Sequence, residues 1–232
     1  MFGRLIERLT GRRIYRSGDL PWGLDFPVDA ARRAPHVRFE TVLDIGANVG
    51  QSTLAFARWF PATTIWSFEP FEEPFRELAR ATHSVNARCY KLAFAAEPGT
   101  ATVELAPTSV NNSLRNDTEN AGGETVRVAT LDTFAEEHAI VRIDFLKIDT
   151  EGFDLEVLKG AERLLRSAAI AFVQGEAGMN RHNTKHVAFE RLKEHLEERN
   201  YTPFGLYEQT PEWSGEARLR FVNAIFRSEA LQ

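Results

Sequence analysis

The stretch Thr41-Val-Leu-Asp-Ile-Gly-Ala-Asn-Val-Gly50 decides the fold. Its first five residues form a short, largely apolar run, which is typical of a buried strand, and the run ends at Gly46. Glycine at positions 46 and 50 permits a tight turn and the close approach of a ligand to the backbone. Residues 51–59 then have the pattern of a helix, whose first amides are free to bind that ligand. The stretch therefore predicts a strand, a ligand-binding turn and a helix.

The same alternation of strands and helices continues along the chain. We expect further strands at 64–68, 87–92, 100–106, 124–129, 143–148, 169–173, 202–207 and 218–226, and helices at 72–81, 154–165 and 188–199, with a short helix that begins at Asp132. Strands separated by helix-length segments predict an α/β fold with a mainly parallel sheet covered on both faces. In such a sheet ligands bind beyond the carboxyl ends of the strands. The turns at Gly46, Glu69, Asp149 and Glu176 should open onto that edge.

The composition narrows the class of protein. The 232 residues, 43% of them hydrophobic, suffice for one substantial globular domain. The net charge of −5 and the pI near 5.8 argue against a nucleic-acid partner, which needs clustered basic residues. A single cysteine cannot form an internal disulfide, and no apolar run approaches the roughly 18 residues of a membrane span. We therefore expect a cytoplasmic protein without an integral membrane span, whose ability to form a homo-oligomer the sequence leaves open.

The turn and the second strand together indicate a nucleoside cofactor. Gly46 and Gly50 lack the spacing of the dinucleotide fingerprint G-x-G-x-x-G, which disfavours NAD. Glu69 ends the second predicted strand, where its carboxylate can accept hydrogen bonds from both hydroxyls of a ribose. An ordinary strand–helix turn remains the alternative interpretation of the glycines alone. The glycine turn followed by a glutamate at a strand end favours the cofactor.

Several motifs occur in an order that resembles a known family. They are Asp44-Ile-Gly-Ala-Asn-Val-Gly50, Phe68-Glu-Pro70, Thr130-Leu-Asp132, Leu146-Lys-Ile-Asp-Thr-Glu-Gly152 and Glu156-Val-Leu-Lys-Gly160. From about Thr41 to Phe226 the chain resembles the FkbM family of S-adenosyl-L-methionine-dependent methyltransferases. The resemblance implies a class I methyltransferase (Rossmann-like) fold with seven strands, the last one antiparallel. It also implies O-methylation of a hydroxyl of a sugar or glycoconjugate, with a polyketide, another small-molecule hydroxyl or a carboxylate as the alternative acceptor.

The resemblance also assigns cofactor-binding residues. It implies that Asp44, Gly46, Asn48 and Gly50 form the pocket for the methionine part of S-adenosyl-L-methionine and that Glu69 binds the ribose. Ser113, in the polar loop Asn111-Asn112-Ser113-Leu114, matches a serine-containing segment of the family that lines the adenosyl or substrate side. A binding module that has kept only the fold would be expected to lack Glu69 or the glycine turn, and both are present.

Catalytic candidates lie at the other predicted strand ends. Asp149 and Glu151 follow the strand 143–148, and Glu176 follows the next strand. Because a hydroxyl acceptor must lose its proton, a side-chain base or a metal ion near it would help. The pair Asp149 and Glu176 permits a Mg²⁺ site, with the capping of a helix as the alternative role for Asp149. His182 is the candidate imidazole base, ranked above His186.

The N-terminal segment, residues 1–40, is expected to be helical and to cover the acceptor site of the methyltransferase domain at 41–232. Trp22 should then point into that site, where an aromatic face can stack on a sugar ring. Trp213 is a second such candidate, and Arg32 and Arg33 are candidates for contact with an anionic acceptor. A dimerisation arm or a plain core cover is the competing interpretation of this segment.

Overall fold

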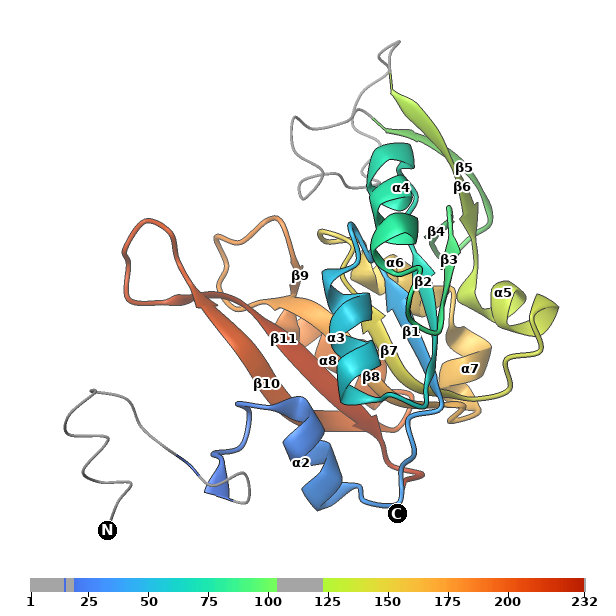
Figure 1. Cartoon of the computed structure of the whole chain (residues 1–232). Helices are drawn as coiled ribbons and strands as arrows, with labels where there is room; N and C mark the ends of the chain where they lie inside the picture. Colours follow the sequence, from blue (N-terminus) through green and yellow to red (C-terminus); the bar gives the residue numbers. More distant parts are fainter. Residues whose placement is uncertain (1–14, 16–18, 104–122, 232) are drawn as a thin grey trace.

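The computed structural model describes residues 15, 19–103 and 123–231 (Figure 1). A large sheet runs through its centre, in the strand order β10-β11-β8-β7-β1-β2-β3. These strands are β1 (Thr41–Ile45), β2 (Thr64–Phe68), β3 (Ala87–Tyr90), β7 (Ile143–Ile148), β8 (Ile170–Gly178), β10 (Tyr201–Pro211) and β11 (Leu219–Ser228), and the two-residue β9 (Val187–Ala188) pairs with β8. Strand β11 is antiparallel to both of its neighbours, whereas the pairs from β3 to β8 are parallel. The predicted class I topology, with its antiparallel last strand, is confirmed.

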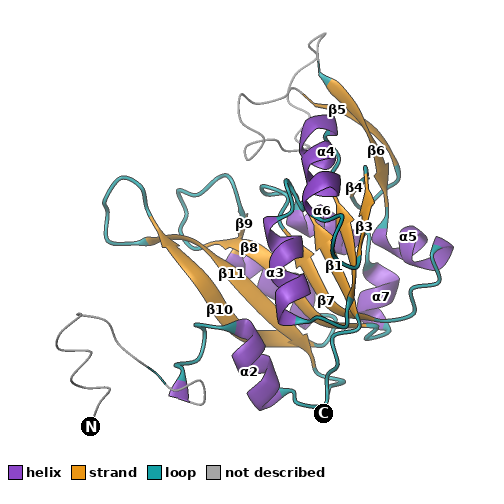
Figure 2. Ribbon diagram, in the orientation of Figure 1, coloured by secondary structure: helices purple, strands orange, loops and turns teal. Residues whose placement is uncertain are grey.

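Helices cover both faces of this sheet (Figure 2). One face packs against α2 (Phe26–Arg33) and α3 (Gln51–Trp59), through a cluster that includes Phe26, Phe56 and Phe145. The other face packs against α5 (Leu131–Glu137), α6 (Asp154–Lys159), α7 (Glu162–Arg166) and α8 (Phe189–Glu197). Helix α4 (Glu72–Ala81) connects β2 to β3. None of the helices in the described ranges has both the length and the apolar character needed to cross a bilayer.

Two predicted strands do not join the large sheet. Strands β5 (Gly99–Val103) and β6 (Glu124–Ala129) pair with each other, and β6 also pairs with β4 (Ala93–Phe94), in a separate three-stranded sheet. A small apolar cluster beneath this sheet contains Phe71 of the α4 N-cap, so the sheet packs beside α4. Its location explains why strand-like alternation continues between β3 and β7 without widening the central sheet.

Two helix predictions need correction. Helix α5 is capped by Thr130, whose hydroxyl accepts a hydrogen bond from the Thr133 amide, while the Asp132 carboxylate accepts from the first amides of α7. The helix expected at 154–165 is interrupted, because it divides into α6 and α7 around Gly160. A side chain at Gly160 would lie 2.2 Å from the carbonyl oxygen of Ala95, so contact with a distant segment accounts for the glycine at this break.

The described part of the N-terminal segment does not cover the carboxyl edge of the sheet. Phe26 of α2 packs against Phe145 and Phe172, which lie in the first halves of β7 and β8. The Trp22 indole donates a hydrogen bond to the carbonyl oxygen of Phe204, at the start of β10. In Figure 1, α2 lies near the end of the sheet where β1 begins. The structure thus places Trp22 away from the predicted acceptor site, and α2 acts as a core cover.

Candidate functional site

A cavity of about 560 Å³ lies where the sheet was expected to bind ligands. One wall is the turn after β1, with Gly46, Ala47 and Asn48, and it continues along α3 from Gln51 to Trp59. The floor consists of polar side chains from three neighbouring strands, namely Lys147, Gln174, Glu176 and Asn223, together with Asp149. The far wall comes from the β10–β11 hairpin. A polar floor between a glycine turn and a hairpin can accommodate a small ligand with several hydrogen-bonding groups.

Backbone contacts hold the turn in place. The amides of Gly46 and Ala47 both donate hydrogen bonds to the carbonyl oxygen of Phe68, which ends β2. Gly46 has a φ of 76°, and an added Cβ would lie 1.9 Å from the carbonyl oxygen of Asp149. Glycine is therefore required here by the crossing of two backbone segments as well as by the turn itself. The same contact brings Asp149 against the turn.

Glu69 supports the turn from the end of β2. Its carboxylate accepts hydrogen bonds from the Asn48 amide at 3.0 Å and from the Phe71 amide at 3.1 Å. Burial raises the pKa of Glu69 to about 7, although these two amides oppose the shift. The carboxylate is thus fixed beside Asn48, a residue of the cavity wall, and it titrates near neutral pH.

A buried ion pair lies directly beneath the turn. The ammonium of Lys147 lies 3.1 Å from a carboxylate oxygen of Asp44 and 3.1 Å from one of Asp149. Asp44 also accepts hydrogen bonds from the hydroxyls of Ser52 and Thr53 on α3. Burial by itself lowers the pKa of Lys147, but the carboxylates of Asp149 and Asp44 raise it by more, so the ammonium stays charged. Lys147 therefore fixes the Asp149 carboxylate at the cavity.

Asp149 and Glu176 meet at the floor of the cavity. The Asp149 side chain is 35% exposed, whereas that of Glu176 is 14% exposed. Burial, the charges of Asp149 and Glu151, and a hydrogen bond to Asp149 raise the pKa of Glu176 to about 9. Near neutral pH Glu176 is therefore protonated and can donate a hydrogen bond to Asp149. A partly exposed carboxylate held between an ammonium and a carboxylic acid can accept a proton from a ligand.

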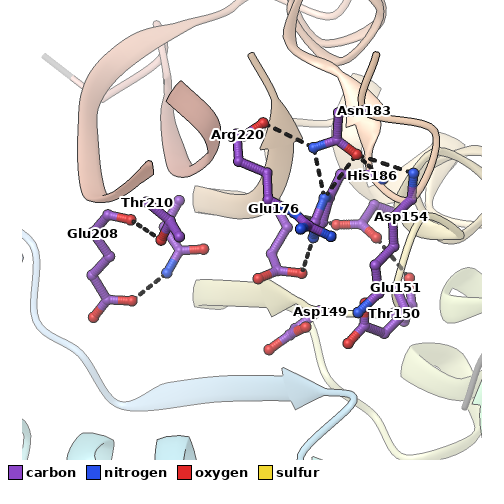
Figure 3. A network of polar contacts seen from close by, with 12 residues as sticks. Asp149, Thr150, Glu151, Asp154, Glu176, Asn183, His186, Glu208, Thr210 and Arg220 are labelled. Atoms are coloured by element: carbon purple, nitrogen blue, oxygen red, sulfur yellow. Dashed lines mark hydrogen bonds and ion pairs between the residues drawn. The ribbon is translucent and has the colours of Figure 1, made fainter. Parts of the chain in front are cut away.

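A network behind the floor positions Glu176 (Figure 3). The His186 ring lies 3.3 Å from a Glu176 carboxylate oxygen, and its other nitrogen contacts the Asn183 side chain. The fully buried Asp154 accepts hydrogen bonds from the Glu176 amide and from the Thr150 hydroxyl. Burial lowers the pKa of His186 and raises the pKa of Asp154 to about 7. These contacts hold Glu176 from the side opposite the cavity.

The structure brings only some of the predicted residues to the cavity. Gly46, Asn48, Asp149 and Glu176 line it. Asp44, Gly50 and Glu69 are not among the lining residues: Asp44 is fully buried, Gly50 packs against α4, and Glu69 is 5% exposed beside the turn. Ser113 lies outside the described residues.

Three further predictions differ from the structure. His182 is exposed, with its ring against Arg181, so the imidazole near Glu176 is His186. Glu151 pairs with Lys185 at 2.6 Å and lies outside the lining. Trp213 is 75% exposed at the hairpin tip, with the Arg220 guanidinium over its ring.

Sequence reasoning missed the hairpin residues and the role of Lys147. The role of Lys147 could have been predicted from the sequence, because a lysine within a mostly apolar strand is buried and a buried ammonium requires carboxylate partners. Glu208 and Asn223 carried no such signal, because a charged or amide residue in a hairpin strand is ordinary.

A divalent cation does not fit the predicted ligands Asp149 and Glu176. The Lys147 ammonium lies 3.1 Å from an Asp149 carboxylate oxygen, so this carboxylate already has a cationic partner. The atoms of Glu151, Glu176 and His186 lie within 4.8 Å of one another, but the Lys185 ammonium is already paired with Glu151. Two lysines thus supply the positive charge that Mg²⁺ would bring.

Comparisons with known proteins identify a family that this chain matches. The model of the methyltransferase FkbM domain matches residues 44–203. The hexuronic acid methyltransferase AglP of Haloferax volcanii is 27% identical over 145 residues, which cover 61% of this chain and 58% of that protein. Methyltransferase 1 of Beauveria bassiana is 24% identical over 154 residues, 56% of this chain and 61% of its own. The chain thus spans about three fifths of the length of these two curated relatives.

The N-terminal domain of EvdMO1, crystallised in the presence of SAH and D-fucose, is 16% identical, with a TM-score of 0.45. The alignment covers 88% of this chain and 83% of that domain.

Proposed function

This chain belongs to the FkbM methyltransferase family, and we propose that it transfers the methyl group of S-adenosyl-L-methionine to a hydroxyl of a sugar or glycoconjugate. One observation carries the proposal, namely a single cavity that joins the Gly46–Asn48 turn to the Asp149 carboxylate. The name of the relative AglP, a hexuronic acid methyltransferase, supports a sugar as the acceptor.

The turn and Glu69 would hold the cofactor. The turn borders the cavity at the N-terminus of α3, which suits the carboxylate of the methionine part. The Glu69 carboxylate, fixed beside Asn48, would accept hydrogen bonds from the two ribose hydroxyls. Asp44 and Gly50 would act indirectly, by shaping the turn. The bound cofactor supplies an activated methyl group on a sulfonium, so the protein needs only to orient the acceptor and remove its proton.

Asp149 would act as the general base. As the acceptor oxygen attacks the methyl carbon, the carbon–sulfur bond breaks and the hydroxyl proton passes to the Asp149 carboxylate. Lys147 and Glu176 hold this carboxylate in place from two sides. His186 lies behind Glu176 and would be a positioning residue.

A methyl ester is the alternative product. The acceptor of AglP is a hexuronic acid by name, and a carboxylate acceptor needs no base. Incubation with labelled S-adenosyl-L-methionine and a panel of hexoses, amino sugars and hexuronic acids would separate the two products. We expect label in an alkali-stable methyl ether of a sugar. Label that mild alkali releases would indicate an ester, and a protein that labels no sugar would contradict the proposal.

Turnover should not depend on a divalent cation. Because Lys147 neutralises Asp149, we expect the rate in EDTA to lie within about twofold of the untreated rate, a difference below 0.5 kcal/mol. Loss of activity in EDTA that Mg²⁺ restores would contradict this expectation and return Asp149 and Glu176 to the role of metal ligands.

A further inference from the structure

An irregular pairing in the hairpin shapes the far wall of the cavity. Tyr207 pairs with Asn223 and Thr210 with Phe221, so two residues of β10, Glu208 and Gln209, lie opposite one residue of β11. Such a bulge redirects side chains and is frequent beside functional sites. Glu208 has a φ of 47°, in the left-handed region that a residue with a Cβ seldom adopts. The backbone thus bears a conformational cost at a glutamate that lines the cavity.

An amide fixes the carboxylate of Glu208. The Asn223 side-chain NH₂ donates a hydrogen bond to it at 2.5 Å. In Figure 3 the dashed line from the Glu208 carboxylate marks this contact, whereas the line from the Glu208 carbonyl oxygen leads to Thr210. The reverse orientation of the amide would place its oxygen against the carboxylate, so the donor must face Glu208. The Asn223 oxygen is buried and accepts no hydrogen bond from the described residues. The unpartnered Asn223 oxygen is therefore a second energetic cost, in addition to the left-handed backbone conformation of Glu208.

The charges around the cavity are unevenly balanced. Lys147 is the only positively charged side chain among the described residues that line the cavity. Its ammonium already lies between the carboxylates of Asp44 and Asp149. Glu208 is exposed and has no cation within salt-bridge distance in the described part of the chain. The Arg220 guanidinium of the same hairpin stacks on Trp213, and Arg220 is not among the lining residues. Within residues 19–103 and 123–231, the far wall therefore presents a negative charge without a cationic partner.

We infer that Glu208, held by Asn223, recognises the acceptor and selects a neutral or amino sugar over a hexuronic acid. This inference rests on the proposed function and specifies its substrate class. The carboxylate accepts hydrogen bonds from sugar hydroxyls or pairs with an amine, while it repels the carboxylate of a uronic acid. Trp59 of the same lining is 45% exposed and offers an apolar face to a sugar ring. The cavity thus disfavours the class of acceptor for which AglP is named.

The test uses matched methyl glycosides at pH 8. Each hexose in the panel is paired with its hexuronic acid, and kcat/KM for methyl transfer is measured with saturating S-adenosyl-L-methionine. We expect the wild-type protein to favour the neutral member at least about tenfold. In Glu208→Gln this ratio should fall about tenfold towards unity, chiefly through KM. Glu216→Gln, an exposed glutamate at the tip of the same hairpin, is the control and should keep the wild-type ratio.

Two outcomes would overturn the inference while leaving the proposed function intact. One is a wild-type preference for the hexuronic acid, and the other is an unchanged ratio in Glu208→Gln. Calorimetry with S-adenosylhomocysteine shows that each variant is folded, since Glu208 lies on the wall opposite the turn and its loss should leave this affinity unchanged. If the wild-type protein neither binds S-adenosylhomocysteine nor methylates any sugar, the proposed function itself fails, and this inference fails with it.

Discussion

Replacing Glu69 with glutamine is expected to weaken the binding of S-adenosylhomocysteine by about 1–3 kcal/mol, because a charged hydrogen-bond acceptor for the ribose is lost. Burial raises the pKa of Glu69 to about 7, so the carboxylate predominates only above that pH. The wild-type affinity should therefore fall between pH 8 and pH 6, whereas the affinity of Glu69→Gln should not follow this change. Titration calorimetry at the two pH values measures both effects.

The free energy of unfolding shows whether the Glu69→Gln variant is folded, so that a weaker affinity can be assigned to the lost contact. Because the pKa of Glu69 is raised from 4.5 on folding, its stabilising contribution is complete below about pH 4.5 and is lost as the pH rises through about 7. Glu69→Gln should therefore gain stability relative to the wild-type protein over that range. Glu73→Gln, an exposed neighbour in α4, is the control for binding. An unchanged affinity in a folded Glu69→Gln variant would remove the ribose assignment.

Replacing Asp149 with asparagine should lower kcat by about 10²- to 10⁴-fold, the usual contribution of a positioned base. The side chain keeps its size at the cavity but can no longer take the proton of the acceptor. The loss should appear in kcat, with the affinity for S-adenosylhomocysteine changed less than about threefold, or 0.7 kcal/mol. Steady-state kinetics on a sugar identified in the labelling panel, together with calorimetry, provides both numbers.

A partly exposed carboxylate outside the cavity, Glu156, controls for general charge effects. Glu156 lies in α6 and pairs with Lys159, outside the cavity lining, so Glu156→Gln should retain the wild-type kcat. A kcat for Asp149→Asn within a few-fold of wild type would assign the base to another residue. Glu176 and His186 would then be the next residues to replace, because they complete the same network.

Much of the central sheet could be predicted because its strands are short apolar runs between clear turn residues. The strands 64–68 and 143–148 and the helices 51–59 and 72–81 agree residue for residue with the structure. Local sequence patterns do not indicate which strands pair with each other. Alternation marked 124–129 as a strand, but pairing with β4 and β5 depends on contacts beside α4 that no local pattern encodes. The division of α6 from α7 likewise depends on the distant Ala95 carbonyl.

The cavity was predictable where it depends on topology. Asp149 and Glu176 meet because Asp149 directly follows β7 and Glu176 lies in the part of the parallel β8 that extends beyond the end of β7. Which histidine faces them depends on the path of the loop between β8 and β9, and the sequence favoured His182 over the buried His186. Glu208 reaches the cavity through a bulge with a left-handed residue, and nothing in Gly205-Leu-Tyr-Glu-Gln209 indicates it. The prediction that Trp22 points into the acceptor site differs from the structure for a related reason. An aromatic residue beside turn residues is as typical of a segment that covers the core as of the wall of a binding site.

A crystal structure of the protein with S-adenosylhomocysteine tests the central claim most directly. The account predicts both ribose hydroxyls within hydrogen-bond distance of the Glu69 carboxylate, and the amino-acid end of the ligand at the Gly46–Asn48 turn. It also predicts that the sulfur faces the part of the cavity that contains Asp149. A ribose bound away from Glu69, or a sulfur directed away from Asp149, would contradict it.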